Sequence, residues 1–251
     1  MTRSGLLVRC APSLPDRGVR FCRGCACRGW LRSSASHSSP TSTASSNSAP
    51  ASSATASAPS TAACRTVPVP APKPNGRLSA PHLKLDPHRT YTVTIVTNCG
   101  TFAFTLDVAQ SPNTSASFYS LVKRGFFDGL TFHRVAAGFV IQGGDPTGTG
   151  AGGPGYTVVE APPKNTQYVR GDVAMAKTQA QPAGASGSQF FIVTAPNVTQ
   201  SAGLTPDYAL VGKVVSGINV VGKIGSLPTN PPQDGSPTPA VVMSSVTVSS
   251  S

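Results

Sequence analysis

Apolar and polar residues alternate over two neighbouring stretches near the middle of the chain. Tyrosine, valine and isoleucine alternate with threonine over residues 91–95, and a second alternating run covers residues 101–107. A period of two is typical of strands that bury one face, and the intervening Asn98-Cys99-Gly100 suits a tight turn. The pattern predicts a β-hairpin.

The pattern changes to a helical period after residue 110. Residues 111–114 place a proline among side chains that cap helices, and Phe118, Leu121 and Val122 then recur on one helix face. Gly125 is suited to ending the run. We predict a helix between these limits.

Residues 131–146 contain two polar interruptions of an apolar pattern. Arg134 and Gln142 occupy positions where a simple buried strand would carry apolar side chains. We predict two short strands around a turn at Gly138. An arginine fixed on a stiff apolar surface beside Phe139 indicates a site that grips a weakly polar group, because its fork of donors keeps its charge.

The remainder of the chain has short apolar runs separated by turn-forming residues. Strand-like runs cover residues 172–176, 189–194, 210–215 and 241–248, and residues 218–224 read as a short helical turn. Many short strands with few helices predict a mainly β domain, in which an antiparallel sheet closes into a barrel. Residues 90–249 are long enough to bury one sizeable core.

The stretch of residues 143–155 is rich in glycine, which predicts a loop. Its spacing Gly148-x-Gly150-x-x-Gly153 matches the dinucleotide-binding fingerprint formally. That fingerprint requires a helix directly after it, and Pro154-Gly155 prevents one. The sequence therefore argues against a nucleotide site here.

The first 89 residues differ sharply in composition from the rest. Residues 1–32 are rich in arginine and cysteine, and residues 33–63 consist almost wholly of Ser, Ala, Thr and Pro. Such sequence cannot bury enough apolar surface to offset chain entropy. We predict a basic N-terminal segment over residues 1–32 and a disordered linker over residues 33–89, extended where prolines recur in its last part.

The net charge of +11 comes almost entirely from this first part of the chain. Residues 1–89 carry twelve Lys or Arg and two acidic residues, whereas residues 90–251 carry eight against seven. The predicted domain therefore lacks a basic surface of the kind that binds nucleic acid, and we expect no nucleic-acid partner. We interpret the basic segment as a tail or a targeting remnant.

The sequence gives opposing indications of location. No apolar run approaches the length of a membrane helix, so we expect no transmembrane segment. The basic start has the charge of a signal peptide, but Leu6-Leu7-Val8 is too short for its hydrophobic region. A long Ser/Thr/Ala/Pro stretch ahead of a compact domain resembles envelope-anchored or secreted bacterial enzymes. On balance we expect an extracytoplasmic or envelope-associated protein rather than a cytoplasmic one.

The cysteines fall into two groups that bear on function. Cys22, Cys25 and Cys27 resemble half of a metal site but lack a second pair of ligands, and we expect no metal. Cys64 and Cys99 border the predicted domain. Two interpretations stay open for them: a disulfide that joins the linker to the first hairpin and indicates an oxidising compartment, or two independent thiols.

The usual catalytic groups are sparse in the predicted domain. Its single histidine, His133, is assigned to structure, and its seven acidic residues are scattered, so a histidine-activated nucleophile and paired carboxylates are both poorly supported. Each polar or aromatic residue of the central stretches has a structural explanation when taken alone. What does concentrate is an apolar and hydrogen-bonding set, whose members are Arg134, Phe139, Gln142, Gln189 and Phe191.

Four motifs occur in the order and spacing of a known family. They are Phe132-His-Arg-Val, Gly138-Phe-Val-Ile-Gln-Gly-Gly-Asp145, Ala174-Met-Ala176 and Gly187-Ser-Gln-Phe-Phe-Ile192. The chain resembles the cyclophilin-type peptidyl-prolyl isomerases over about residues 90–248. The resemblance implies a closed eight-stranded antiparallel barrel capped by two helices, an enzyme without a cofactor, and substrates that are proline-containing peptides or unfolded proteins. We also expect a monomer.

The resemblance assigns roles to single positions. It makes Arg134 the catalytic residue and Phe139 with Phe191 the wall of a proline pocket. Gly203 and Tyr208 stand where many eukaryotic members have tryptophan and histidine, which is similar to bacterial members, and Lys177 replaces the usual asparagine. The substrate-binding positions implied are Phe139, Val140, Gln142, Ala176, Lys177, Gln189, Phe191, Leu204 and Tyr208.

The chemistry of prolyl isomerisation suits this inventory. Rotation about a peptide bond meets a barrier of about 18–20 kcal/mol, while the cis and trans forms of X–Pro differ by only about 0.5–1 kcal/mol. A catalyst needs an apolar grip on the ring and a charged donor that favours the twisted amide, which Arg134 offers. Two alternatives stay open: a non-catalytic proline-peptide binder or chaperone of the same fold, and a metal or redox protein built on Cys22, Cys25 and Cys27.

Overall fold

The computed structural model describes residues 63–251. The predicted basic segment, the cluster of Cys22, Cys25 and Cys27, and residues 33–62 of the predicted linker lie outside the described residues.

The predicted hairpin starts the sheet. β1 (Tyr91–Thr97) and β2 (Gly100–Leu106) pair antiparallel, with Val93 opposite Phe104 and all of the odd-numbered residues of β1 buried. Since opposite residues share a face, this hairpin presents one apolar surface, as the alternation predicts. Gly100 has a φ of +131°, which only glycine adopts readily, and it makes the turn.

Ten further strands complete the β-structure, most of them short. Their bounds are β3 (Arg134–Ala136), β4 (Val140–Gly143), β5 (Val158–Val159), β6 (Asp172–Met175), β7 (Ala185–Ser186), β8 (Phe190–Val193), β9 (Leu210–Ser216), β10 (Thr229–Asn230), β11 (Asp234–Pro237) and β12 (Met243–Ser250). One ten-stranded sheet has the order β10-β11-β3-β4-β8-β6-β9-β2-β1-β12, and β5 pairs with β7 separately. Every pairing is antiparallel.

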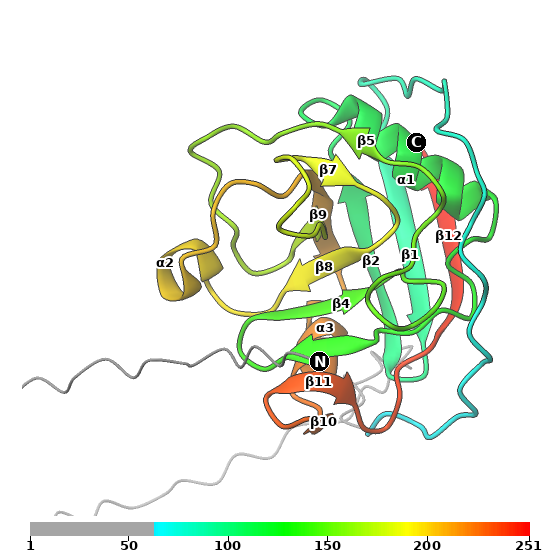
Figure 1. The fold of residues 1–251 in the computed structure, drawn as a ribbon, viewed down its shortest axis with the longest axis vertical. Coiled ribbons are helices and arrows are strands. Elements are labelled where there is room, and N and C mark those ends of the chain that lie inside the picture. The colour runs from blue at the N-terminus through cyan, green and yellow to red at the C-terminus, as the bar shows by residue number, and fades with distance from the viewer. Residues whose placement is uncertain (1–62) are drawn as a thin grey trace, which may run out of the picture. The chain divides into compact units, whose positions relative to one another are not determined.

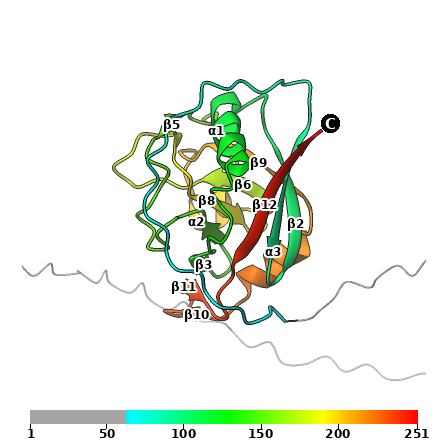
Figure 2. The same ribbon diagram turned by 90° about the vertical axis from the view of Figure 1, so that its right-hand side faces the viewer.

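Helices lie near opposite ends of the strongly curved sheet, as Figures 1 and 2 show for α1 (Pro112–Lys123) and α3 (Ile218–Gly225). A third, shorter helix is α2 (Val198–Ala202). Phe118 of α1 is fully buried, stacks on Phe127 with ring centroids 4.8 Å apart, and meets Phe104 and Phe190 edge-on. The predicted helix and the predicted helical turn are thus confirmed as α1 and α3, and the aromatic cluster joins α1 to the sheet.

The sheet corrects the expectation of a closed eight-stranded barrel capped by two helices. Mainly β structure with few helices is confirmed, but the main sheet has ten strands, and among the described residues no ladder joins its end strands β10 and β12. β11 pairs with β3 through Asp234 and Gly235, so β3 is not an edge strand of this sheet. Backbone bonds link residues 129–132 to residues 241–243 only at the start of β12.

The last part of the predicted linker runs extended along the domain, from the bottom to the top of both views (Figures 1 and 2). Residues 63–89, which we call the strap, form no helix or strand, yet backbone bonds tie Lys73 to Pro146 and Leu78 to Pro154. Prediction of a disordered linker therefore fails for the strap. Its own apolar content is low, but its backbone polar groups find partners on the domain.

A disulfide fixes the start of the strap. The structure joins Cys64 to Cys99 at the tip of the first hairpin, and the two cysteines are 35 positions apart in sequence. Asn98 adds to the anchor, since its Nδ2 donates to the carbonyls of Arg65 and Ala240 and its Oδ1 accepts from the N–H of Val242. The strap, the hairpin and the entry to β12 are thereby held together.

Candidate active site

The central strands place one row of side chains across the sheet. Arg134 of β3 lies opposite Gln142 of β4, Gln142 lies opposite Phe191 of β8, and Phe191 lies opposite Ala174 of β6. Directly opposed residues in antiparallel strands point to the same face. The three predicted site residues of this row therefore share one surface with a small residue beside them.

Neighbouring positions on the same strands face the other way. Val135, Ile141, Ile192 and Val173 form the next row, and all four are fully buried in the main core. The period of two thus divides these strands between a core face and a site face. Burial of the core row fixes the register, because a slip of one residue would turn the core row outward.

A small pocket of about 130 Å³ lies on the site face. Phe191 is 5% exposed, and its ring meets the Tyr208 ring edge-on at 5.4 Å between centroids. Val140, 2% exposed, and the partly buried Ala176 give further apolar surface. The lining residues are Arg134, Phe139, Val140, Gln142, Ala176, Lys177, Phe191, Leu204 and Tyr208.

The far side of the pocket comes from the segment after α2. Gly203 ends that helix in the left-handed region with a φ of 65°, and the next residue, Leu204, returns to the pocket with its N–H bonded to the carbonyl of Val198. Glycine suits this position because a side chain would strain the backbone there.

Tyr168 holds Tyr208 in place from behind. The fully buried Tyr168 hydroxyl donates to the Tyr208 carbonyl at 2.7 Å and accepts from the Tyr208 N–H at 3.0 Å. Burial raises the pKa of Tyr168 to about 12, so the phenol stays neutral. Sequence reasoning missed this residue, because a single tyrosine in a polar loop carries no recognisable pattern.

The guanidinium of Arg134 is held by two partners. Its Nε and Nη2 donate to the two carboxylate oxygens of Asp234 at 2.7 and 2.8 Å, and Nη1 donates to Gln142 Oε1 at 3.0 Å. A bidentate pair of this kind fixes the plane of the fork. Of the five N–H groups, one on each terminal nitrogen has no partner among residues 63–251. Asp234 lies on β11 and was not expected from the sequence.

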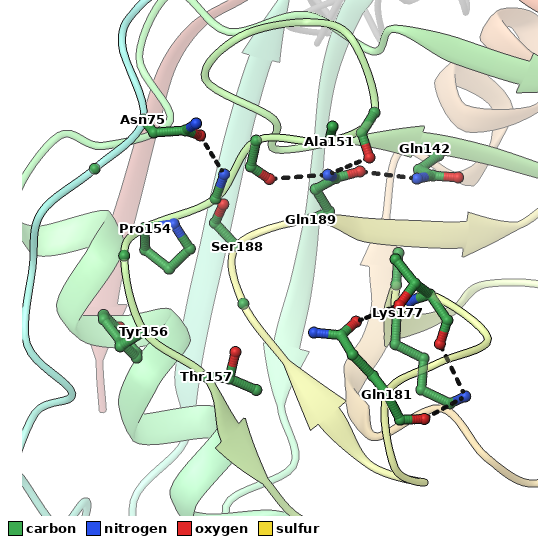
Figure 3. Close-up of a pocket in the computed structure, with 18 residues that line it drawn as sticks. Asn75, Gln142, Ala151, Pro154, Tyr156, Thr157, Lys177, Gln181, Ser188 and Gln189 are labelled. Carbon is green, nitrogen blue, oxygen red and sulfur yellow. Dashed lines mark hydrogen bonds between the residues drawn. The ribbon is translucent and has the colours of Figure 1, made fainter.

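A second, larger cavity of about 500 Å³ adjoins the small pocket (Figure 3). The two share Gln142, Ala176 and Lys177 as lining residues. Gln189 lines only the larger one, where its Oε1 accepts from Gln142 Nε2 at 3.0 Å. The other walls are the glycine-rich loop of residues 150–157, the loop of residues 176–181, and two strap residues, Asn75 and Gly76.

Two titratable groups lie next to the site without entering the small pocket. Burial lowers the pKa of His133, Asp145 opposes this, and Arg134 adds to it, so the imidazole is held neutral. Neither ring nitrogen has a hydrogen-bond partner among the described residues. Burial raises the pKa of Asp145, but hydrogen bonds from Thr147 and from the N–H groups of Gly152 and Gly150 bring it below its usual value.

The structure brings together nine of the ten residues that the sequence singled out for catalysis or substrate binding. All except Gln189 line the small pocket, and Gln189 bonds to one that does. Groups that the sequence did not indicate are Asp234, Tyr168 and the strap. Among the described residues there is no group of three or more His, Cys, Asp or Glu that could hold a metal ion, and no helix long and apolar enough to span a membrane.

Comparisons with known proteins agree with this geometry. The family model described as "Cyclophilin type peptidyl-prolyl cis-trans isomerase/CLD" matches residues 92–248. A peptidyl-prolyl cis-trans isomerase of Helicobacter pylori is 37% identical over 156 residues, which cover 56% of this chain and 90% of the relative. Peptidyl-prolyl cis-trans isomerase B of Bacillus subtilis is 44% identical over 116 residues, which cover 46% and 76% respectively.

A solved structure also matches the fold. The crystal structure of a cyclophilin type isomerase of Cryptosporidium parvum, determined in the presence of the dipeptide Ala-Pro, superposes with a TM-score of 0.56 at 31% identity, covering 63% of this chain and 98% of that one. The chain therefore belongs to the cyclophilin-type peptidyl-prolyl cis-trans isomerases. Its function is catalysis of cis–trans isomerisation at X–Pro peptide bonds in proteins.

Proposed function

We propose that the small pocket binds the proline ring of a substrate and that Arg134 is the catalytic residue. The pocket suits a compact apolar ring, because Phe191, Val140 and Tyr208 supply apolar surface on several sides. Burying the ring there fixes the residue that follows the bond to be rotated, while the preceding residue stays free to turn.

The observation that carries the proposal is the guanidinium fixed at the edge of an apolar pocket. In the transition state the amide loses its planarity, so the lone pair is no longer shared with the carbonyl and gathers on the prolyl nitrogen. A free N–H of Arg134 that donates to this nitrogen stabilises the twisted form more than the planar one, and this lowers the barrier. The step needs no nucleophile, because no covalent bond is broken.

Exchange measurements test the assignment. Arg134→Ala is expected to reduce kcat/KM on a proline tetrapeptide by about 100-fold or more, the usual cost of removing an electrostatic donor. Arg134→Lys should restore little, since an ammonium cannot form the planar fork. NMR exchange spectroscopy of the peptide gives the rate directly. Unchanged turnover in Arg134→Ala contradicts the assigned mechanism.

A second candidate function is a non-catalytic proline-peptide binder or chaperone of the same fold. The observation that favours it is the Asp234 carboxylate, which compensates the Arg134 charge. Asp234 and Gln142 together accept three of the five N–H groups of the guanidinium. This function predicts that wild-type protein binds proline peptides without accelerating their exchange. The same NMR experiment distinguishes the two functions.

Four properties of the whole protein are part of the proposal: its domain bounds, oligomeric state, substrate class and location. The isomerase domain spans residues 90–249, with the strap as its N-terminal extension, and it acts as a monomer on proline-containing peptides or unfolded proteins. We place it in an extracytoplasmic or envelope-associated compartment, because a disulfide between Cys64 and Cys99 persists where thiols are oxidised. Thiol labelling of the native protein directly after lysis tests the location: labelling of both cysteines argues against it.

A further inference from the structure

The strap pairs with the glycine-rich loop beside the active site. The Gly76 N–H donates to the Gly153 carbonyl at 2.9 Å, and the Leu78 N–H donates to the Pro154 carbonyl at 2.9 Å. The Asn75 Oδ1 accepts from the Gly153 N–H at 3.0 Å. Both backbone polar groups of Gly153 are therefore bound by the strap, which fixes this part of the loop.

Close backbone approach makes the contact specific. A Cβ built on Gly76 would lie 2.5 Å from the Pro154 carbonyl oxygen, and one built on Gly155 would lie 2.6 Å from the Gly76 carbonyl oxygen. Both distances are far inside van der Waals contact, and both obstacles are backbone atoms that cannot turn away. Glycine at both positions is what permits the strap to lie this near.

The same loop holds Gln189 on its other side. Gln189 Nε2 donates to the carbonyls of Gly150 and Gly152, each at 2.9 Å, and Figure 3 shows Asn75 and Gln189 bonded to the loop from opposite sides. Because two acceptors face this amide, its nitrogen must point to the loop and its oxygen must point away. The loop carbonyls thus decide the orientation of the Gln189 amide.

That orientation is passed on to the guanidinium. Gln189 Oε1 accepts from Gln142 Nε2 at 3.0 Å, which leaves Gln142 Oε1 to accept from Arg134 Nη1 at 3.0 Å. A rotated Gln189 amide would present N–H groups to the Gln142 N–H groups, and Gln142 would then have reason to rotate its oxygen away from Arg134. One series of bonds therefore runs from the strap through the loop and two amides to Arg134.

We propose that Asn75 and Gly76 of the strap are positioning residues for the isomerase reaction, acting through the glycine-rich loop and the amides of Gln189 and Gln142 on Arg134. The inference rests on the proposed role of Arg134. The strap does not touch the small pocket, so its effect falls on the orientation of the catalytic fork and not on the grip of the proline ring.

Four variants of the full chain test this. Gly76→Val forces the strap off Pro154, Asn75→Ala removes one acceptor, and Asn75→Asp keeps an acceptor oxygen in nearly the same shape. Arg77→Ala is the matched control, because Arg77 is exposed and its side chain makes no hydrogen bond or ion pair within the described part of the chain. For each, kcat and KM are measured by NMR exchange on a proline tetrapeptide, with thermal unfolding followed in parallel.

The expected result is a split between the two kinetic constants. We expect kcat to fall about 5–10-fold in Gly76→Val and about 2-fold in Asn75→Ala, with KM changed less, in line with the modest net value of single hydrogen bonds. The kcat of Asn75→Asp should be close to that of wild type, because an acceptor oxygen is kept. The kcat of Arg77→Ala should equal that of wild type. A kcat equal to that of wild type in all four variants overturns the proposal. It is also overturned if kcat falls in Asn75→Asp as much as it falls in Asn75→Ala.

A second readout separates this inference from the proposed function. The side-chain amide resonances of Gln189 and Gln142 and the Nε–H of Arg134 report the series of bonds without turnover. They are expected to shift in Gly76→Val and Asn75→Ala but not in Arg77→Ala. Wild-type protein that does not accelerate exchange refutes the proposed function, whereas unshifted resonances in folded Gly76→Val refute the role of the strap even when turnover is normal.

Discussion

Asp234 binds Arg134 through two parallel hydrogen bonds, although the two residues are 100 positions apart in sequence. The Arg134 side chain is 36% exposed and the Asp234 side chain 53%, so water screens the pair. Such pairs contribute only about 0–1 kcal/mol to stability. Its value to the protein therefore lies in geometry, because the pair holds the plane of the guanidinium beside the pocket.

Removal of this carboxylate should impair catalysis more than folding. We expect Asp234→Ala to lower kcat by about 3–10-fold through loss of orientation, with a stability change below about 1 kcal/mol. Asp234→Asn keeps one acceptor oxygen, so its kcat should lie between those of wild type and Asp234→Ala. NMR exchange and denaturant unfolding measure the two effects. A rise in kcat would mean that Asp234 restrains Arg134 instead of orienting it.

Lys177 should give the enzyme a preference for acidic residues near the proline. It borders both cavities, and of the described residues that line the larger one it alone carries a charge. Its Nζ lies 5.4 Å from the Tyr208 ring centroid and contacts the Gln181 carbonyl at 3.3 Å, without a carboxylate partner among residues 63–251. An unpaired ammonium at this place attracts anionic side chains.

Peptides that carry Glu, Gln or Lys at either of the two positions before the proline test the preference. We expect kcat/KM to be about 2–5-fold higher for Glu than for Lys, the range of an exposed charge pair. Lys177→Asn should remove the difference and Lys177→Glu should reverse it, most clearly at low salt. Identical ranking of the peptides by all three proteins contradicts the role of this charge.

Tyr168→Phe should weaken substrate binding. The substitution leaves the N–H and carbonyl of Tyr208 without their partner, at a cost of about 1–3 kcal/mol in stability. Because Tyr208 lines the pocket and does not carry the catalytic donor, KM should rise several-fold while kcat changes little. Tyr119→Phe, on α1 and away from the pocket, is the control. Unchanged KM in folded Tyr168→Phe argues against this support.

Stability should fall as the pH decreases from about 7 to 5. The folded pKa of His133 is lowered from 6.5, so the unfolded chain takes up a proton first as the pH falls, and the free energy of unfolding decreases in that window. The lowered pKa of Asp145 acts in a separate range, since its stabilising effect is lost only as the pH falls below its usual value of 3.8.

His133→Asn isolates the first of these effects. The variant lacks the titrating ring, so the slope of unfolding free energy between pH 7 and 5 should become flatter than in wild type. Urea unfolding at several pH values gives the slope. An equally steep slope in both proteins assigns the pH dependence to other groups.

The disulfide should contribute about 2–4 kcal/mol to the free energy of unfolding, the range for loops of this kind. Cys64→Ser and Cys99→Ser, separately and together, are expected to lose this amount, and the double variant should lose no more than either single one. Urea unfolding of wild type with and without a reducing agent provides the control. A midpoint that does not change on reduction shows that the bond adds nothing.

Short-range patterns predicted the parts of this fold that depend on neighbours in sequence. The hairpin of β1 and β2 follows from alternation and an Asn-x-Gly turn, and α1 follows from the spacing around Phe118. Half of the site is similarly local: Arg134 and Gln142 lie symmetrically about Gly138, so a turn there places them opposite each other. Gln189 and Phe191 were recognised on a second strand-like run, and family resemblance was needed to add the residues after β6 and after α2.

Other parts of the fold depend on pairing between segments that are distant in sequence. The local pattern of apolar and polar residues does not predict such pairing. β11 consists of Asp-Gly-Ser-Pro and forms because β3 offers an unpaired edge, and this places Asp234 beside Arg134. The start of α1 has no cap from its own N-cap side chain. Instead, the Glu160 carboxylate, 46 positions away in sequence, accepts from the Thr114 N–H. Composition likewise misjudged the strap, because it counts a segment's own apolar residues and not the surface that receives its backbone.

The alternation along β3, β4 and β8 limits how this enzyme can diversify. Val135, Ile141 and Ile192 are buried in the core. Arg134, Gln142 and Phe191 in the adjacent row form the proposed site, so these strands offer few neutral positions. New substrate preferences must therefore arise in the surrounding loops, where Lys177 and Leu204 reach the pocket from outside the sheet. The strands keep the proposed site residues in register, whereas substitutions in the loops can change which peptide sequences are bound.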